Sequence, residues 1–217
     1  MGRVPSLTKW QKSMAGYVFD LKSLTDPVTL DAPLQIEAGS CVALSGVSGS
    51  GKSRFLRAIA DLDPNNADVF LAGKSRSQFH TPDWRRCITY VPAESGWWAE
   101  QVVAHFHGND LVSAHKLMSA LGLPKAATGW DVARLSTGER QRLALVRALV
   151  QEPAVLLLDE PTAPLDAKST ESVEKLLTDF LVQGGVVFLV THDAVQAMRL
   201  ADRFLDVADL CIREVPP

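Results

Sequence analysis

The sequence has few of the features that mark secreted, membrane-spanning or metal-binding proteins. It contains three cysteines in 217 residues, without a C-x-x-C pair or metal-ligand spacing. We interpret Cys41 and Cys87, which lie in apolar runs, as small buried hydrophobic residues. No apolar run approaches the roughly 18 to 20 residues of a bilayer-spanning helix, and the first twenty residues lack the apolar segment of a signal peptide. We therefore expect a cytosolic protein.

The sequence also lacks a strong excess of either charge. The net charge is −3, so we expect no nucleic-acid partner. Hydrophobic residues make up 47% of the chain, which is enough for one substantial core. We find no internal repeat and no low-complexity segment, and we expect one domain over residues 1–217.

The most informative stretch is residues 46–53, GVSGSGKS, which fits the pattern G-x-x-x-x-G-K-[ST] at every fixed position. An apolar run at 41–45 predicts a strand before it, and apolar spacing over 53–60 predicts a helix after it. This context distinguishes a phosphate-binding P-loop from a glycine- and serine-rich turn with a chance lysine. Glycines let successive N–H groups point inward, and the helix N-terminus adds partial positive charge.

We expect this loop to surround the phosphates of a nucleotide. Lys52 would reach the β- and γ-phosphates, and Ser53 would place its hydroxyl on Mg²⁺. The expected phosphate-binding residues are Gly46, Val47, Ser48, Gly49, Ser50, Gly51, Lys52 and Ser53.

A second acidic motif follows an apolar strand pattern at 154–158. Such a run suits the centre of a parallel sheet, where ligands bind beyond the carboxyl ends of the strands. Asp159 is suited to holding Mg²⁺, and Glu160 to polarising the water that attacks the γ-phosphate. An acidic turn on the surface is the alternative, which the upstream P-loop disfavours.

Residues 135–139, LSTGE, precede a basic amphipathic helix at 140–149. Ser136 and Glu139 fit an S-x-x-E capping box, which would explain both residues. A capping box does not need Gly138, which weakens a first helical turn. The functional alternative is a second phosphate site at a helix N-terminus.

The rest of the chain alternates strand and helix patterns, which favours a mostly parallel sheet covered on both faces. Strands are predicted at 17–21, 28–36, 67–72, 87–91, 186–190 and 203–207, and helices at 138–151, 168–183 and 194–200.

Residues 97–130 differ in character and predict a helical insertion with helices at 99–106 and 110–121. Trp97 and Trp98 open this insertion. Two adjacent tryptophans on a helix cannot both point inward, so we expect one of them to be exposed for a partner.

Together these stretches resemble the ATPase subunit of ABC transporters. GVSGSGKS is similar to the family's Walker A motif, LSTGE to its signature, and LLLDEPT to Walker B. The resemblance continues with the loop APLD, which ends at Asp166, and with THD, whose His192 is similar to the switch histidine. Asp193 and Gln196 also fit a capping box there, which is the structural alternative for this loop. Order and spacing agree from about residue 17 to residue 207.

The resemblance implies the fold class α/β. It implies a P-loop NTPase of the ABC type, with a mostly parallel core sheet, an N-terminal antiparallel β subdomain and an inserted helical subdomain. The core would comprise residues 17–92 and 131–210, and the helical subdomain about 93–130.

The resemblance also implies a site shared by two subunits, which enclose two ATP molecules. Lys52, Glu160 and His192 would be the catalytic residues, with His192 touching the γ-phosphate. The signature and the APLD loop would complete the partner's ATP site through Ser136, Gly138, Glu139 and Asp166.

Two departures from the family pattern stand out. Ala93 occupies the place of a glutamine, and we expect Glu94 to substitute for it as a metal ligand with Ser53 and Asp159. The family also stacks adenine on an aromatic residue, which is missing near 23–24. Tyr17 and Phe19 would serve only after a shift in register; otherwise they pack in the sheet.

We therefore expect a cytosolic ATP hydrolase that works with ATP and Mg²⁺. It would form a dimer with a second ATPase subunit and lie at the inner face of the cell membrane on a separate permease. The alternatives are a non-transport ABC ATPase acting on nucleic acid or ribosomes, and a regulatory or assembly module that binds nucleotide without hydrolysis. A small-molecule P-loop kinase would leave LSTGE unexplained. The sequence names neither the cargo nor its direction.

Overall fold

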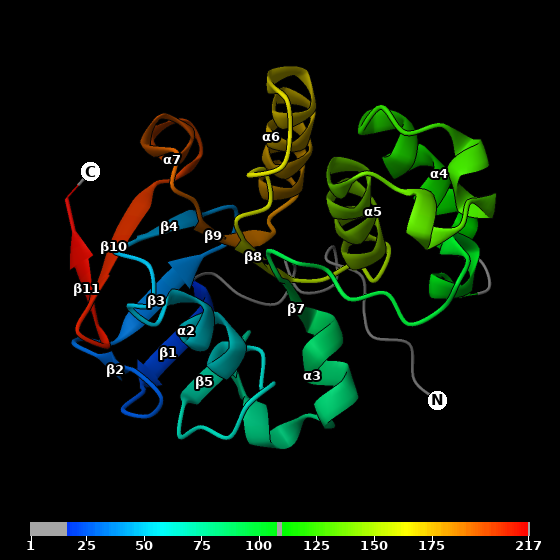
Figure 1. The fold of residues 1–217 in the computed structure, drawn as a ribbon. Helices are drawn as coiled ribbons and strands as arrows, with labels where there is room; N and C mark the ends of the chain where they lie inside the picture. Colours follow the sequence, from blue (N-terminus) through cyan, green and yellow to red (C-terminus); the bar gives the residue numbers. More distant parts are fainter. Residues whose placement is uncertain (1–16, 108–109, 217) are drawn as a thin grey trace.

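The structure, a computed structural model, describes residues 17–107 and 110–216 (Figure 1). The strands are β1 (Tyr17–Ser23), β2 (Thr29–Leu30), β3 (Leu34–Glu37), β4 (Cys41–Ser45), β5 (Asp68–Leu71), β6 (Lys74–Ser75), β7 (Ile88–Val91), β8 (Val155–Asp159), β9 (Val186–Val190), β10 (Arg203–Ala208) and β11 (Cys211–Val215). The α-helices are α2 (Lys52–Ile59), α3 (Thr81–Cys87), α4 (Asp110–Ala120), α5 (Thr137–Leu149), α6 (Ala167–Val182) and α7 (Ala194–Leu200). The 3₁₀ helices are η1 (Arg76–Gln78), η2 (Val102–His105), η3 (Lys125–Gly129) and η4 (Val132–Arg134).

The central sheet has the strand order β2-β11-β10-β4-β9-β8-β7. The five strands from β10 to β7 run parallel, and β11 pairs antiparallel with β10. Strands β8 and β9 are buried along their whole length, as expected for central strands covered on both faces. The loops that follow the parallel strands therefore meet at one edge of the sheet, which confirms the predicted mostly parallel core.

A second sheet has the order β3-β1-β5-β6 and is antiparallel throughout. It packs over the central sheet through aromatic contacts at Phe188 on β9. The ring centroid of Phe19 lies 5.2 Å from that of Phe188, and that of Phe55 on α2 lies 6.2 Å from it. This sheet matches the predicted N-terminal β subdomain and places Phe19 in the core.

Helices cover both faces of the central sheet (Figure 1). On one face α2 and α3 bury Leu56, Ile59 and Trp84 together with the antiparallel sheet. On the other face α5 and α6 bury their apolar residues, Leu143 and Leu177 among them. Cys41 and Cys87 are buried free thiols, as predicted. None of the described helices combines the length and the hydropathy needed to cross a membrane.

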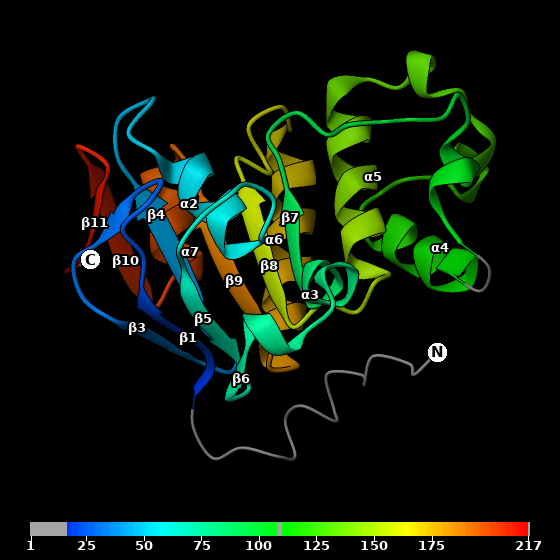
Figure 2. The ribbon, with the colours of Figure 1, turned by 90° about the horizontal axis from the view of Figure 1, so that it is seen from below.

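The helical subdomain extends from the edge of the sheet beyond α5, at the opposite end of the molecule from β11 (Figure 2). Its two ends run side by side. The N–H of Val102 donates to the carbonyl of Trp130 at 3.0 Å, and the N–H of Val132 donates to that of Glu100 at 2.8 Å. Helix α4 packs on α5. Helix α5, which begins within LSTGE, therefore connects the subdomain to the sheet. The assignment of about residues 93–130 to the helical subdomain remains a prediction.

The strand predicted at 28–36 is wrong, because the structure divides it between two sheets. Thr29–Leu30 pairs with β11 in the central sheet, and Leu34–Glu37 pairs with β1 in the antiparallel sheet. Residues 31–33 form the bend between them, and Pro33 has no N–H for a ladder bond. Strand β11 was not predicted. Its residues resemble a polar tail, and only their pairing with β10 shows that they form a strand.

The helix predicted at 99–106 is also wrong, because only η2 forms there. The imidazole of His105 instead holds the backbone of this segment in a loop. Its Nε2 accepts from the N–H groups of Trp98 and Ala99 at 3.1 and 3.2 Å, and its Nδ1 lies 3.1 Å from the carbonyl oxygen of Gln101. The tryptophans thus lie in a loop held by His105. One of them, Trp98, is 67% exposed, as predicted.

Candidate nucleotide-binding site

The loop between β4 and α2 requires glycine at defined positions. Gly46, Gly49 and Gly51 have φ angles of 133°, 80° and 112°, which side chains rarely tolerate. A Cβ atom at Gly46 would overlap the carbonyl oxygen of Val207, and one at Gly51 would lie 2.8 Å from Val28. The loop therefore keeps its backbone exposed toward the ligand edge of the sheet.

Two polar side chains of this loop fit a bound anion. Lys52 is 8% exposed, and its Nζ donates to the carbonyls of Gly46 and Val47 at 2.7 and 2.9 Å. The hydroxyl of Ser50 is buried and has no hydrogen-bond partner within the described part of the chain. An ammonium and an unpaired hydroxyl at a helix N-terminus suit phosphate oxygens. Ser53 is exposed in the first turn of α2.

Asp159 lies at the carboxyl end of β8 and is 6% exposed. Its Oδ2 accepts a hydrogen bond of 3.0 Å from the hydroxyl of Tyr90 on the neighbouring strand β7. Burial, and then the charge of Asp159, raise the pKa of Tyr90 above its usual value. Tyr90 was missed by the sequence reasoning, because nothing local in the sequence shows that β7 pairs with β8.

The structure brings Glu160 and His192 together. Glu160 follows β8 with a φ angle of 49°, and its N–H donates to the carbonyl of Val190 at 2.9 Å. His192 follows β9, and its Nε2 lies 3.0 Å from Oε1 of Glu160. The two side chains are 30% and 59% exposed, so substrate and water can reach them. The neighbouring strands β8 and β9 thus place a carboxylate and an imidazole at the same edge as the P-loop.

The capping box predicted for LSTGE is present. The N–H of Glu139 donates to Ser136 Oγ at 3.2 Å, and the N–H of Ser136 donates to Glu139 Oε2 at 2.8 Å. Ser136 donates to the Glu139 carboxylate from its N–H and also from its Oγ at 2.8 Å, and these two bonds, the backbone one first, hold the pKa of Glu139 below its usual value. The structural explanation therefore accounts for both residues, and their contact with a partner's nucleotide remains a prediction.

Close packing accounts for Gly138 within one chain. A Cβ atom there would lie 3.2 Å from Cδ2 of Leu165 and 3.3 Å from the carbonyl oxygen of Pro164. Asp166, in the same loop, caps α6 by accepting from the N–H of Ser169 at 2.7 Å. That bond lowers the pKa of Asp166. The start of α5 and the loop before α6 thus form one surface, to which the signature and APLD residues contribute.

Glu94 and the pair formed by Glu160 and His192 line two different pockets. Glu94 is exposed and lines a pocket of about 610 Å³ with residues that include Arg140 and Pro164. The described residues hold no group of three or more His, Cys, Asp or Glu arranged around a metal position. The oxygen donors that fit Mg²⁺ are the hydroxyl of Ser53 and the buried carboxylate of Asp159. A metal-binding role for Glu94 remains a prediction.

The capping box predicted for Asp193 and Gln196, in the loop after β9, is only half formed. Asp193 caps α7, because its Oδ1 accepts from the N–H groups of Val195 and Gln196 at 2.9 and 3.0 Å. The side chain of Gln196 takes no part in the cap and turns inward, where it is 1% exposed. Sequence spacing suggested only the capping role.

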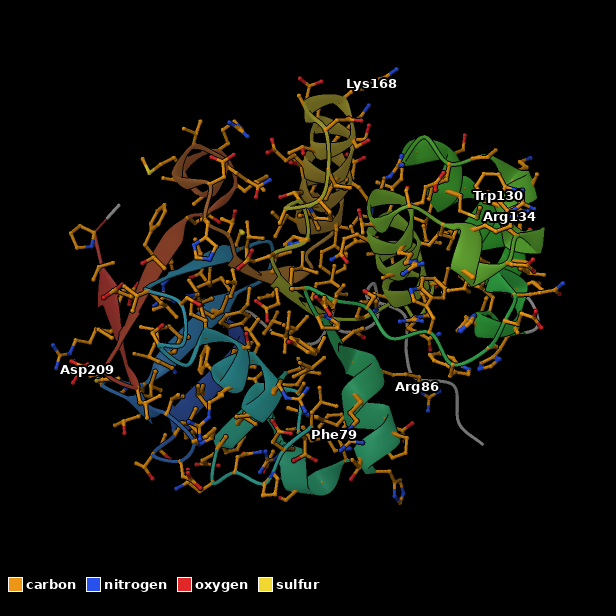
Figure 3. All side chains as sticks on the ribbon, viewed as in Figure 1. Phe79, Arg86, Trp130, Arg134, Lys168 and Asp209 are labelled. Atoms are coloured by element: carbon orange, nitrogen blue, oxygen red, sulfur yellow. The ribbon has the colours of Figure 1, made fainter. Side chains whose placement is uncertain are left out.

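Figure 3 labels side chains on several of the elements described above. Lys168 lies at the N-terminal end of α6, Asp209 at the turn between β10 and β11, and Trp130 and Arg134 in the helical subdomain (Figure 3).

Comparison with known proteins agrees with a nucleotide-binding site at this edge of the sheet. The family model described as ABC transporter matches residues 30–163. An aliphatic sulfonates import ATP-binding protein of Pseudomonas fluorescens, SsuB 2, is 38% identical over 186 residues, covering 84% of this chain and 68% of that protein. SsuB 1 of Pseudomonas syringae pv. tomato is 37% identical over 214 residues, covering 88% of this chain and 76% of that protein.

Two solved structures share the fold. The structure of an ATP-binding subunit of an ABC transporter has a TM-score of 0.79 and 21% identity, over 91% of this chain and 89% of that one. A dimeric, post-hydrolysis structure of the ATP-binding cassette MJ0796, bound to ADP and phosphate, has a TM-score of 0.76 and 22% identity, over 91% and 97%. The ABC-type α/β fold is thereby confirmed. The chain belongs to the ABC transporter family, as an ATP-binding subunit.

Proposed function

We propose that this protein binds and hydrolyses ATP between two copies of the chain and so powers a separate membrane permease. The observation that carries the proposal is the 3.0 Å contact between Glu160 and His192 at the edge that also holds the P-loop. A carboxylate there can accept a proton from an attacking water, and the imidazole can orient the carboxylate and contact the γ-phosphate.

The other residues of the edge have binding roles in this proposal. The backbone of residues 46–53 and Lys52 hold the phosphates, and Lys52 exchanges its two carbonyl partners for phosphate oxygens. Ser53 and Asp159 would hold Mg²⁺. The ion would neutralise charge on the β- and γ-phosphates. Tyr90 holds the Asp159 carboxylate in place through its hydroxyl.

A basic groove is the proposed docking surface for the permease. It has a volume of about 310 Å³, and none of its described lining residues is acidic. Arg85 and Arg86 line it from α3, and Arg147 lines it from α5 (Figure 3 labels Arg86). The guanidinium carbon of Arg147 lies 4.8 and 4.9 Å from the ring centroids of Trp97 and Trp98. Arg86 forms an ion pair with Asp83, whereas Arg147 donates to the carbonyl of Gly96 at 3.0 Å. The exposed Trp98 beside the Arg147 guanidinium suits a partner segment that carries carboxylates.

The relatives' names support import as the direction of transport and aliphatic sulfonates as the first cargo class to assay. The protein would lie at the cytoplasmic face of the membrane through its permease. Assays of cargo uptake need that permease, because in this proposal the cargo passes through it.

The test is ATP turnover by the purified protein. Glu160→Gln should still bind MgATP, lose turnover by roughly 10²–10⁴-fold, and accumulate as an ATP-bound dimer. Light scattering after size exclusion measures the dimer. The control is Glu171→Gln, a change of an exposed carboxylate on α6. Equal turnover by Glu160→Gln and wild type would refute the assignment of Glu160.

A further inference from the structure

A buried glutamine joins the two loops that carry Glu160 and His192. Gln196, on α7, is 1% exposed. Its Oε1 accepts hydrogen bonds from the hydroxyl of Thr162 at 3.0 Å and from that of Thr191 at 2.9 Å. Thr162 lies in the loop after β8, two residues beyond Glu160, and Thr191 immediately precedes His192.

The other end of the same side chain is anchored on α6. Its Nε2 donates to Oε1 of Glu174 at 3.1 Å. Glu174 in turn accepts from Nη2 and Nε of Arg199 at 2.6 and 3.1 Å. The hydrogen bond from Arg199 is the main reason why the pKa of Glu174 is below its usual value. An ionised carboxylate can only accept, so the amide nitrogen must face Glu174 and the amide oxygen must face the two threonines.

This arrangement links the two loops through one side chain. Each threonine hydroxyl has one donor proton, and both protons point to the same oxygen atom of Gln196. Loss of that oxygen would leave two part-buried hydroxyls without their acceptor and would remove the side-chain link between the two loops. The hydrogen bond from the N–H of Glu160 to the carbonyl of Val190 would remain, so we expect a local loosening of both loops. Glu160, Thr162, Thr191 and His192 help to line one pocket of about 240 Å³.

We propose that Gln196 is a positioning residue that sets the contact between Glu160 and His192. This inference deepens the proposed function and rests on it. Gln196 touches neither reacting group. It acts through Thr162 and Thr191, one step along the chain from His192 and two from Glu160.

The network also explains why residue 196 is a glutamine rather than a glutamate in this chain. A carboxylate at 196 would face the carboxylate of Glu174 at the 3.1 Å that now separates an amide from it. Like charges at that distance repel each other strongly. Exchange of the two side chains, Gln196→Glu with Glu174→Gln, would restore an amide opposite a carboxylate and keep the net charge. It would also give up one of the two hydrogen bonds from Arg199, because an amide has only one acceptor oxygen.

The kinetic test compares four variants with wild type by steady-state ATP hydrolysis. Gln196→Leu should lower kcat by about tenfold and leave KM for ATP within about twofold, because displacement of catalytic groups costs turnover more than ground-state binding. Gln196→Glu should lower kcat by as much as Gln196→Leu or by more. The exchanged pair should recover most of the lost kcat. The matched control is Met198→Ala, an exposed position on the same helix, which should behave as wild type.

The structural test needs no turnover. Amide hydrogen exchange of the nucleotide-free protein, followed by mass spectrometry, should be about tenfold faster over 160–166 and 190–194 in Gln196→Leu, and restored in the exchanged pair. Unchanged exchange in both segments would overturn the inference, as would a normal kcat in Gln196→Leu. An inactive wild type would instead count against the proposed function, and the exchange experiment would still decide the role of Gln196.

Discussion

The ligand edge of the central sheet and the helical subdomain are held in different ways. At the edge, the positions of the site residues follow from five parallel strands that end together, with Asp159 and Glu160 after β8 and His192 after β9. In the helical subdomain, side chains bind backbone across short loops, as His105 does at its entrance. One region takes its geometry from a ladder of strands, the other from individual polar contacts.

This difference decides what can be predicted. A buried parallel strand is a local apolar run, and its end marks a ligand site in any sheet of this type. A loop folded around one imidazole has no comparable signal, because an apolar spacing of 3 and 4 is equally compatible with a helix. We expect substitutions at the edge to alter chemistry and substitutions in the subdomain to alter stability.

The largest expected effect is loss of the P-loop charge. Lys52→Ala should abolish ATP turnover and weaken nucleotide binding, because the ammonium is the only cation placed inside the described P-loop. Turnover and binding of a fluorescent ATP analogue measure the two effects. Lys116→Ala, an exposed change on α4 in the helical subdomain, is the control. Full hydrolysis by Lys52→Ala would remove the P-loop from the mechanism.

The second prediction separates packing from charge at Gly138. Gly138→Ala tests the close approach to Pro164 and Leu165 alone, and should cost about 1 kcal/mol of unfolding free energy. Gly138→Asp adds a carboxylate that would face the partner's γ-phosphate in the proposed dimer, and should lower turnover well beyond Gly138→Ala while each monomer still binds nucleotide. Equal turnover in the two variants would show that packing alone requires glycine.

In the helical subdomain, His105→Leu should lower the free energy of unfolding by about 2 kcal/mol or more. The substitution leaves the N–H groups of Trp98 and Ala99 without their acceptor. Urea denaturation followed by tryptophan fluorescence measures the change. The matched control is His107→Leu at an exposed position two residues away. A loss of ATP turnover larger than the loss of folded protein would contradict the division between the two regions.

The smallest effect concerns the capping box, where the two regions meet. The pKa of Glu139 is lowered in the folded protein, so the folded state binds fewer protons than the unfolded state around and below pH 4.5. The stabilisation by Glu139 is therefore complete above that range and is lost as pH falls through the lowered pKa. Glu139→Gln should be less stable than wild type by under about 1 kcal/mol at neutral pH, and the difference should shrink in acid. Urea denaturation at several pH values tests this, and a difference that grows in acid would contradict it.

The sequence alone determined the P-loop, the acidic motif after β8, the capping box and the α/β class, because each depends on neighbours within a few residues. The tertiary structure decided everything that depends on strand pairing or on contacts between distant segments. It split residues 28–36 between two sheets, replaced a helix by the loop around His105, and brought Tyr90 to Asp159 and Glu160 to His192. Gln196 shows the limit most clearly. Its spacing from Asp193 predicts a cap, but burial against Thr162 and Glu174 gives its amide stronger partners than the helix end offers.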